Sequence, residues 1–369
     1  MNPRIAVTGP DGFLAWHLRC AHWAHTGVDI TPIGRSEYSD AARMDAALEQ
    51  VDVVVHLAGV NRGVDDSVLA KANIELAQGL ATGLARAGRS IDVIYGNSIH
   101  SRGVSAFGSS KRRGAEILEA ACGALEGRFV DVLLPNVFGE HGKPFYNSFV
   151  ASFCHQLARG DVPTIDLDRE VPLLHAQDAA AVLLVAAGGE TAGELAPAGT
   201  PFAVSEVLKR LSGIRDRYVD AQLPDLSDPF TRALFNTYRS YTVPQGWPIM
   251  PTRHSDQRGS LVEAVRASGG ETQVFYSTTV PGFTRGEHFH LRKVERFLVL
   301  SGEAVIRMRR LFTEEVVEFR VSGDEPAILD MPTLWTHSII NVGDRDLLTL
   351  FYADDEFNPA DPDTYWIAV

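Results

Sequence analysis

The stretch between positions 282 and 341 constrains the fold more than any other, because it holds three histidines and one glutamate at fixed spacing. His288 and His290 lie two apart, and residues two apart on a β-strand point to the same face. We expect Glu295 on the next strand of a hairpin, completing one pocket with the later His337. Three imidazoles and one carboxylate suit a divalent transition metal. The spacing therefore predicts β-strands that converge on a metal.

Glycine, proline and asparagine positions extend this pattern. The first segment reads G-x5-H-x-H-x4-E-x6-G from Gly282 to Gly302, and the second runs from Pro332 to Asn341. Together they resemble the two signature motifs of the cupin superfamily, small double-stranded β-barrels that usually hold one metal. The resemblance implies an all-β cupin (jelly-roll) barrel with zinc, or another divalent transition metal, on the three histidines and the glutamate. The alternative is two surface histidines on a hairpin and an unrelated third. Leu334 departs from the motif, which usually has glycine there and so a different local turn.

The length of 369 residues suggests two domains of ordinary size. Prolines and a glycine interrupt all periodicity at residues 241–251, so we expect a linker there. The predicted domains are residues 1–244 and 245–369. Alternating β-branched runs follow the linker, at 272–278, 297–300, 304–309, 315–321, 327–329 and 347–352.

Composition and charge exclude several classes of protein. Apolar residues make up 45% and charged residues 22%, as in soluble globular proteins. The net charge of −13 argues against a nucleic-acid partner. No apolar run approaches the ~20 residues that span a bilayer, and MNPRIAVTG shows no signal pattern, so we expect a cytoplasmic protein without a membrane partner. Three distant cysteines indicate no disulfide framework, and we interpret them as core residues: Cys20, Cys122 and Cys154.

The first residues predict a dinucleotide-binding turn. A short apolar strand over 4–7 is followed by TGPDGFLA and by an amphipathic helix over 14–23. Glycines at such a turn let the backbone approach a pyrophosphate, which then sits on the helix N-terminus. Ala15 takes the third glycine position and still permits close helix packing. The residues expected to contact the cofactor are Thr8, Gly9, Gly12, Phe13 and Leu14.

Arg35 bears on which cofactor binds. An NAD-binding chain usually has an acidic residue about 20 positions past the glycines, for the ribose 2′-OH. This chain offers Arg35 there, which suits the 2′-phosphate of NADP. An arginine in a solvated loop is the alternative.

Apolar runs and helical patterns alternate along the N-terminal half. Residues 51–57 form an apolar run of the kind that is buried on both faces of a parallel sheet. The alternation continues at 70–87, 91–95, 111–125 and 130–134. It predicts βαβ units, and therefore an α/β Rossmann-type doubly wound parallel sheet.

Three sequence signals in this half resemble one enzyme family. They are the TGxxGxxA turn, HLAG at 56–59, and Ser98 followed by FGSSK at 107–111. Together they resemble the extended short-chain dehydrogenase/reductases, whose usual substrates are nucleotide sugars. The resemblance implies that Leu57, Ala58 and Lys111 contact NADP(H).

The catalytic set of that family is a Ser or Thr, a Tyr, and a Lys four residues after the Tyr. The four-residue gap places Tyr and Lys on one helix face, where the ammonium can lower the pKa of the phenol. Ser98 and Lys111 match this set, but Phe107 stands at the tyrosine position. Phenylalanine has no proton to transfer, a loss of ~10²–10⁴-fold in rate. Tyr95 and His100 are near in sequence. Three interpretations remain: cofactor binding without turnover, another acid, or an introduced substitution.

Candidate substrate-binding residues come from two places. Asn136 and Asn147 fall in PNVFG and YNSF, where this reductase family has its substrate-binding loop, although a turn asparagine is the alternative reading. Arg258 and Glu263 belong to SDQRGSLVEAV, which resembles the DxRGxxxE stretch of nucleotide-sugar 3,5-epimerases. Those epimerases are metal-free, and their histidine matching His288 is catalytic.

The order of parts, with HLAGVNR, KPFYNS and FNPADPDTYW, is similar along nearly the whole chain to the CapF family of capsular-polysaccharide enzymes. That family joins an NADPH-dependent 4-keto reductase to a zinc cupin epimerase, acts on UDP-activated N-acetyl-6-deoxyhexoses, and forms homodimers. The resemblance implies a bifunctional nucleotide-sugar epimerase/reductase of polysaccharide biosynthesis. Two alternatives stay open: a cupin-only epimerase or isomerase with a non-redox Rossmann module, and a sugar-nucleotide-binding protein without turnover.

Overall fold

The computed structural model describes residues 3–61, 65–257, 259–270 and 272–369. The chain packs as two compact units, neither of which is continuous in sequence. Unit 1 comprises Met1–Phe138, Gly142–Phe149 and Arg169–Ala203. Unit 2 comprises Gly139–His141, Val150–Asp168 and Val204–Val369. Within the described ranges, no helix is long and apolar enough to cross a membrane.

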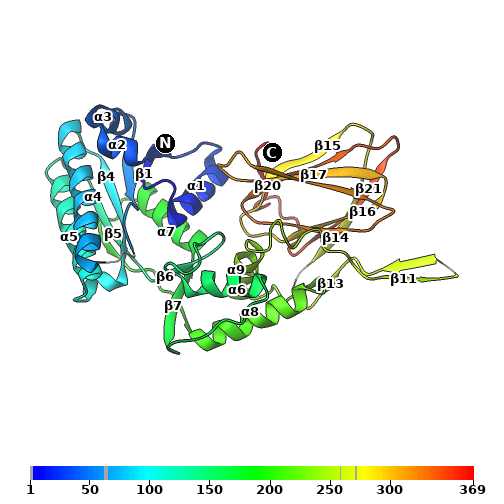
Figure 1. Ribbon diagram of the computed structural model, residues 1–369. Coiled ribbons are helices and arrows are strands. Elements are labelled where there is room, and N and C mark those ends of the chain that lie inside the picture. The colour runs from blue at the N-terminus through cyan, green and yellow to red at the C-terminus, as the bar shows by residue number, and fades with distance from the viewer. Residues whose placement is uncertain (1–2, 62–64, 258, 271) are drawn as a thin grey trace. The chain divides into compact units, whose positions relative to one another are not determined.

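Unit 1 is built around a six-stranded sheet with the order β2-β1-β3-β4-β5-β8, in which every neighbouring pair is parallel (Figure 1). Its strands are β1 (Ile5–Thr8), β2 (Thr31–Ile33), β3 (Val53–His56), β4 (Asp92–Ser98), β5 (Phe129–Leu134) and β8 (Gly193–Leu195). A smaller sheet of order β6-β7-β9 contains β6 (Asn136–Phe138), β7 (Glu170–His175) and β9 (Thr200–Ala203).

Helices cover both faces of the parallel sheet because successive strand residues point to opposite sides. Val53 and Val55 of β3 pack in one core with Leu18 of a helix, and Val54 packs in the other core with Leu80. One face carries α1 (Phe13–Thr26) and α7 (Ala176–Gly188); the other carries α3 (Ala41–Glu49), α4 (Asp66–Ala87) and α5 (Ala106–Gly123) (Figure 1). The short α2 (Arg35–Ser39) and η1 (Ile99–Arg102) complete this unit. The predicted Rossmann-type doubly wound sheet is confirmed.

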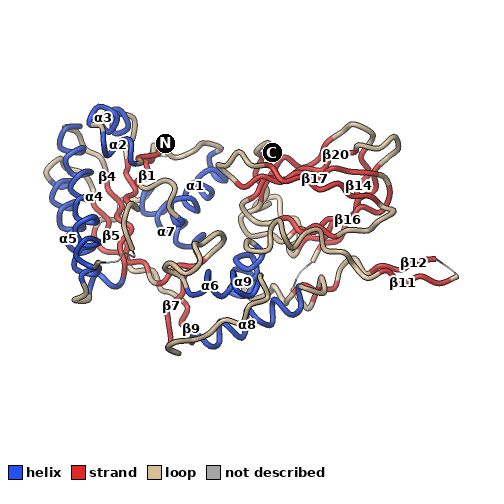
Figure 2. Tube along the Cα trace, in the orientation of Figure 1, coloured by secondary structure: helices blue, strands red, loops and turns tan. Residues whose placement is uncertain are grey.

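Unit 2 contains two antiparallel sheets, shown as red strands in Figure 2, with the orders β14-β21-β16-β19 and β18-β17-β20-β15-β22. Residues of both sheets share one apolar core, including Phe297, Ile306, Leu329 and Ile339, so the predicted all-β domain is confirmed. The strands are β14 (Gln273–Thr279), β15 (Thr284–Phe289), β16 (Glu295–Ser301), β17 (Glu303–Arg310), β18 (Val316–Ser322), β19 (Ile328–Met331), β20 (Trp335–Asn341), β21 (Leu347–Ala353) and β22 (Tyr365–Trp366).

Three helices and two small strand pairs also belong to unit 2. The helices are α6 (Phe149–Ala158, from Val150 onward), α8 (Val204–Tyr218) and α9 (Pro229–Arg239). The pairs are β10 (Gln222–Leu223) with β13 (Arg266–Ala267), and β11 (Arg253–Asp256) with β12 (Gly259–Val262). The β11–β12 pair is a hairpin separate from the two sheets (Figure 2), and its strand residues are exposed except for the half-buried Val262.

Buried polar contacts tie α8 and α9 to the sheets of unit 2. The hydroxyl of Tyr218, at the end of α8, donates to Asp330 Oδ2 at 2.8 Å, and Arg296 Nη2 donates to the same oxygen at 2.9 Å. Arg239 of α9 donates to the carbonyl of Met331 at 3.0 Å. Trp247, inside the stretch 241–251 that the sequence predicts as a linker, packs in the core of the sheets. Helices that precede this stretch in sequence therefore fold with the strands that follow it.

Candidate functional site

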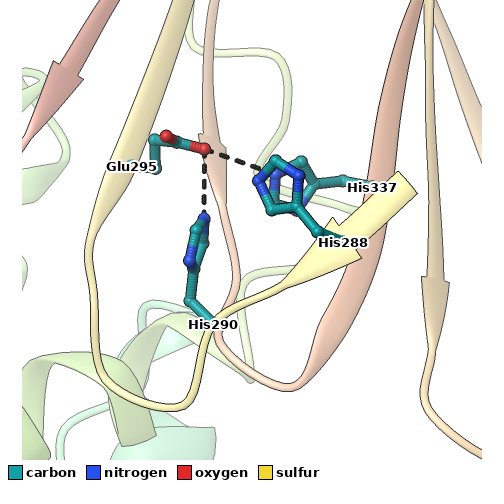
Figure 3. A group of neighbouring side chains, drawn as sticks. All are labelled: His288, His290, Glu295 and His337. Atoms are coloured by element: carbon teal, nitrogen blue, oxygen red, sulfur yellow. Dashed lines mark hydrogen bonds and ion pairs between the residues drawn. The ribbon is translucent and has the colours of Figure 1, made fainter. Parts of the chain in front are cut away.

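The three histidines and the glutamate predicted from spacing come together between the two sheets of unit 2 (Figure 3). One ligand atom from each of His288, His290, Glu295 and His337 lies within 4.8 Å of the others. Glu295 Oε2 is 3.2 Å from His290 Nε2 and 3.3 Å from His337 Nε2. The ring of His288 lies 4.6 Å from that of His337, between centroids.

The strands that carry this cluster are paired differently from the prediction. The sequence predicts Glu295 on the second strand of a hairpin, but β15 pairs with β20 and β22, whereas β16 pairs with β19 and β21. The short connection 290–294 therefore crosses from one sheet to the other, and the hairpin prediction is wrong. This crossing places Glu295 opposite the histidines of the other sheet.

A bulge in β15 aims His288 at the cluster. The pairing of β15 with β20 shifts register between Gly286 and His288, and Glu287 has a positive φ of 62°. After the shift, His288 lies opposite His337. A Cβ on Gly286 would come within 2.6 Å of the His337 carbonyl oxygen, so only glycine fits there. Bulges of this kind re-aim side chains next to functional sites.

Leu334 occupies the turn position where the cupin motif usually has glycine. It is buried and has a φ of 66°, the left-handed region in which a non-glycine residue costs about 1–2 kcal/mol. Its backbone N–H donates to the carbonyl of His290 at 2.9 Å. Leucine thus keeps a conformation that glycine adopts more readily, and burial of its side chain offsets part of the cost.

Hydrogen bonding shows that the cluster suits a metal. His290 Nδ1 donates to the carbonyl of Asp363 at 2.5 Å, so in the neutral ring the lone pair of Nε2 faces the carboxylate of Glu295. Two electron-rich atoms at that distance repel each other unless a proton or a metal ion lies between them. His288 Nδ1 is buried and has no hydrogen-bond partner in the described part of the chain. Three imidazole nitrogens and a carboxylate oxygen are ligands that zinc and related ions prefer.

The protonation states of Glu295 and His288 agree with this donor set. Burial opposes ionisation of Glu295, but His290 and His337 outweigh it and hold its pKa well below the ordinary value. Burial and the neighbouring histidines lower the pKa of His288 to about 3. At neutral pH the glutamate is therefore ionised and His288 is neutral, and metal ligands must be in these forms. The pKa of His290 is raised: burial lowers it, but the carboxylate of Glu295 raises it more.

Asp363 holds the connection between two of these residues, and the sequence did not single it out. Its buried carboxylate accepts from the backbone N–H groups of Leu291, Arg292 and Lys293, at 2.9, 3.0 and 2.7 Å. Its carbonyl accepts from His290. Partners of this kind orient metal ligands and tune their basicity. The only signal for Asp363 in the sequence is the acidic, proline-rich stretch FNPADPDTYW.

The predicted dinucleotide turn joins β1 to α1 in unit 1. Gly9 has a φ of 67°, and a Cβ there would come within 3.0 Å of the Cα of Ala58, so glycine is required. Gly12 is the N-cap of α1 and provides no side-chain cap, which leaves backbone N–H groups of the first turn for an anion. Phe13 begins α1, and Leu14 packs against the core.

Thr8 connects this turn to the end of β3. Its Oγ1 accepts from the backbone N–H groups of Leu57 and Ala58, at 3.0 and 2.9 Å. It therefore donates its own proton to His56 Nδ1, at 2.8 Å. The predicted cofactor residues at 8–9 and 57–58 are thus adjacent.

The end of β2 carries both an arginine and a carboxylate. Arg35 begins α2 and is exposed. Glu37, which the sequence analysis did not consider, accepts from the backbone N–H of Gly34 at 2.7 Å. Burial opposes ionisation of Glu37, but this bond and the Ser36 hydroxyl lower its pKa below the ordinary value. A 2′-phosphate here would meet the charge of Arg35 and also that of Glu37.

Ser98, Phe107 and Lys111 lie on β4 and α5. Ser98 ends β4, and Phe107 is half-buried in the first turn of α5. Lys111 is buried, and its Nζ donates to the carbonyl of Gly96 at 2.9 Å. Burial lowers the pKa of Lys111 to about 8, so its ammonium is charged at neutral pH.

Tyr95 does not replace the missing tyrosine. It is 2% exposed, and its hydroxyl points to α5, where a Cβ on Gly114 would come within 2.9 Å of it. The Lys111 ammonium lies over the Tyr95 ring, 4.3 Å from the centroid. His100 is exposed in η1, and its backbone N–H donates to Ser98 Oγ at 3.2 Å.

The predicted substrate residues are in separate places. Asn136 begins β6 and donates to the carbonyl of Pro172 at 3.4 Å, and Asn147 is exposed in the loop before α6. Glu263 is exposed just after β12, 3.8 Å from Arg266. Arg258 lies outside the described residues.

Residues 5–195 match the NAD dependent epimerase/dehydratase family, and residues 254–365 match the polysaccharide biosynthesis C-terminal domain. The sequence is 32% identical, over 99% of both chains, to UDP-2-acetamido-2,6-beta-L-arabino-hexul-4-ose reductase from Pseudomonas aeruginosa. The crystal structure of the capsular polysaccharide assembling protein CapF from Staphylococcus aureus matches over 100% of both chains, at 30% identity and a TM-score of 0.63. UDP-N-acetylglucosamine 4-epimerase from Bacillus cereus covers 57% of this chain and 81% of its own, at 22% identity and a TM-score of 0.50, a likeness in fold alone.

Proposed function

The chain belongs to the NAD dependent epimerase/dehydratase family, in the CapF-like form with a polysaccharide biosynthesis C-terminal domain, and we propose that it is a bifunctional nucleotide-sugar enzyme. The C-terminal half would epimerise a UDP-4-keto-6-deoxy-N-acetylhexosamine, and the N-terminal half would reduce its ketone with NADPH. The observation that carries the proposal is the convergence of His288, His290, Glu295 and His337 in a chain that also has a dinucleotide turn. We propose the functional boundary at 244/245, between the two matched regions.

The substrate class follows from the chemistry of the relatives. The Pseudomonas aeruginosa relative is named as the reductase of a UDP-linked 2-acetamido hexul-4-ose, a sugar with a ketone at C4. Such a ketone acidifies the protons on the neighbouring carbons, so a base there can exchange stereochemistry. One ketone thus supports both proposed reactions, and reduction at C4 ends the epimerisation.

For the epimerase, we propose that the three histidines and Glu295 hold zinc or another divalent transition metal. When bound, this metal supplies Lewis-acid polarisation of the ketone. The chain itself contributes the ionised Glu295, the neutral His288 and the Asp363 carbonyl that orients His290. In the metal-free form of the proposal, the neutral His288 is the base, as the matching histidine is in the 3,5-epimerases that the sequence resembles. Arg258 and Glu263 would contact the substrate.

For the reductase, we propose that NADP(H) binds at the β1–α1 turn with Arg35 near its 2′-phosphate. Thr8, Gly9, Gly12, Phe13, Leu14, Leu57 and Ala58 would line the dinucleotide. The charged Lys111 would hold the nicotinamide ribose, and Ser98 would hold the sugar, together with Asn136 and Asn147. Phe107 donates no proton, so the acid must be another group such as His100, or water.

A second candidate function has a specific observation in its favour. If the Rossmann unit is a non-redox binding module, only the C-terminal half turns substrate over. Phe107 and the inward-pointing hydroxyl of Tyr95 both favour this function. A binding protein without any turnover is disfavoured, because it does not require four converging ligand side chains.

We also propose a homodimer. Val274, Phe275 and Tyr276 are exposed on β14, which is an edge strand of its sheet. An exposed apolar edge strand is a site for pairing with another chain, and soluble proteins normally cover it. Analytical ultracentrifugation should give twice the mass of one chain.

NADPH and UDP-sugars are cytoplasmic metabolites, which favours the cytoplasm as the location of this protein.

The direct test of the epimerase is exchange of substrate protons with solvent. In D₂O, the purified protein should incorporate deuterium next to the ketone of a 4-keto-6-deoxy UDP-N-acetylhexosamine, as seen by NMR. Elemental analysis should find about one metal per chain, most of it zinc. His290→Ala should lose both metal and exchange, whereas His254→Ala, on the exposed strand β11, should keep both. Exchange at the wild-type rate in His290→Ala would refute the epimerase assignment.

A further inference from the structure

The C-terminal strand β22 places an indole ring beside the cluster. Trp366 lies opposite His288 in the pairing of β15 with β22, and the two ring centroids are 5.5 Å apart. The same His288 ring contacts the rings of His290 and His337. The indole is therefore on the face of β15 that carries the proposed metal ligands. Trp366 is nevertheless 73% exposed.

This exposure is not the result of a loose chain end. After Trp366, the backbone N–H of Ile367 donates to the carbonyl of Glu287 at 2.9 Å, and the Thr336 hydroxyl donates to the carbonyl of Ile367. Arg309 donates to the carbonyl of Ala368 at 2.5 Å. Before Trp366, the carboxylate of Asp363 is bound to three backbone N–H groups. The strand is tied down on both sides of the exposed ring.

The neighbouring aromatic residue, Tyr365, is half-buried, in contrast to Trp366. Tyr365 packs its ring against Phe289, with centroids 5.3 Å apart, on the other side of the strand. Trp366 instead keeps most of its large apolar surface in contact with water, which is unfavourable by about 25 cal/mol for each Å². The backbone on both sides of Trp366 is held, and its exposed ring contacts a residue of the candidate site, so the indole offers a flat face on which a ligand can stack.

We propose that Trp366 is the platform on which the pyranose ring of the substrate stacks, with the C–H groups and the C6 methyl of the 6-deoxy sugar against the indole. The inference rests on the proposed function. The ring lies beside His288, so it meets the sugar whose carbons react there. The nucleobase is separated from that sugar by two phosphates and a ribose. Trp366 thereby favours 6-deoxy sugars over sugars with a C6 hydroxyl.

The test compares binding of three ligands to the full chain by calorimetry: UDP, a 4-keto-6-deoxy UDP-N-acetylhexosamine, and UDP-N-acetylglucosamine. Trp366→Ala should weaken binding of the 6-deoxy ligand by on the order of tenfold, since loss of a partly buried aromatic contact is of that size. UDP alone should bind as before. Trp366→Phe should keep most of the affinity. The matched control is Phe283→Ala, which removes another exposed ring, at the opposite end of β15.

Each result either supports or overturns the stacking role of Trp366. Unchanged affinity of Trp366→Ala for the 6-deoxy ligand, or an equal loss for all three ligands, would overturn the stacking role. An equal loss in Phe283→Ala would do the same. The proposed function is judged separately, from deuterium exchange by the wild-type protein. A wild type that exchanges while Trp366→Ala binds normally rejects only the platform, and a wild type that neither binds nor exchanges rejects both.

Discussion

At the scale of single residues, Phe107 bears most on the proposed reductase activity. It lies on α5 where the proposed mechanism would need a tyrosine, four residues before a buried, charged Lys111. Phe107→Tyr should therefore gain NADPH oxidation with a 4-keto-6-deoxy UDP-sugar, by about 10²–10⁴-fold over the unaltered chain. Loss of NADPH absorbance measures this rate.

The matched control is Tyr95→Phe. It removes a hydroxyl that points at Gly114 while keeping the ring under the Lys111 ammonium. The rate of NADPH oxidation should not change. If Tyr95→Phe abolishes oxidation, or if Phe107→Tyr gains nothing while the wild type already oxidises NADPH, the proton comes from a different group than we assign.

The buried Lys111 should make the folding stability depend on pH. Burial lowers its pKa from 10.5 to about 8, although Asp131 opposes the shift. Between those pH values the unfolded chain binds more protons than the folded chain, so folding stability rises with pH. Relative to Lys111→Met, the wild type should gain roughly 3 kcal/mol from pH 8 to 10.5. Urea unfolding at several pH values measures the gain. If the stability difference between the wild type and Lys111→Met does not change with pH, burial does not lower the pKa of Lys111.

Members of the histidine–glutamate cluster were predictable where a pattern in the sequence encodes them. The spacing of His288, His290, Glu295 and His337 indicated a common site, because strand periodicity and motif positions are local properties. Asp363 and Trp366 were not predictable in the same way. Their roles depend on contacts with residues some 70 or more positions earlier, and no local period reports such contacts.

At the scale of elements, two buried carboxylates hold the connection 290–294: Asp354 accepts from the backbone N–H of Val294, and Asp363 accepts from three other backbone N–H groups. Asp363→Ala would leave the backbone N–H groups of Leu291, Arg292 and Lys293 without their acceptor. Unsatisfied groups of this kind cost about 1–3 kcal/mol each, so we expect a loss of roughly 3–5 kcal/mol in the free energy of unfolding. Metal affinity should fall about 10–100-fold, because His290 loses its fixed orientation.

Asp361→Ala is the control for that variant. Asp361 is exposed and pairs with Arg292 at 2.6 Å, and such surface pairs contribute at most about 1 kcal/mol. Urea unfolding and competition with a metal chelator should leave this control near the wild type. Equal effects of the two substitutions would contradict the special role of Asp363.

Element types were predictable, but boundaries and pairings were not. The apolar runs at 51–57 and 130–134 became β3 and β5, because parallel strands buried on both faces need continuous apolar residues. Helix α5 starts at Ala106 rather than at 111, since Ser105 caps it by accepting from the backbone N–H of Gly108. The pairing of β15 with β20, in place of a hairpin with β16, depends on sheet closure and leaves no signal in the local sequence.

At the scale of the whole molecule, two proposed sites use different residues and different ligands. The change of period along the sequence predicts a boundary at 244/245, and both fold classes are confirmed. The interleaving of the compact units was not predictable. It results from buried contacts such as that of Thr333 with Glu140, which join segments of unit 2 over a hundred positions apart.

One measurement tests the central claim, that a single chain has two separable activities on one sugar. Wild type, His290→Ala and Lys111→Met are each incubated in D₂O with a 4-keto-6-deoxy UDP-N-acetylhexosamine, and deuterium next to the ketone is followed by NMR while calorimetry gives NADPH affinity. We expect His290→Ala to lose exchange and keep NADPH affinity, because sites that share no residues usually act independently. Lys111→Met should keep exchange and bind NADPH at least about tenfold more weakly. Loss of both properties in either variant, or exchange that survives His290→Ala, would contradict the account.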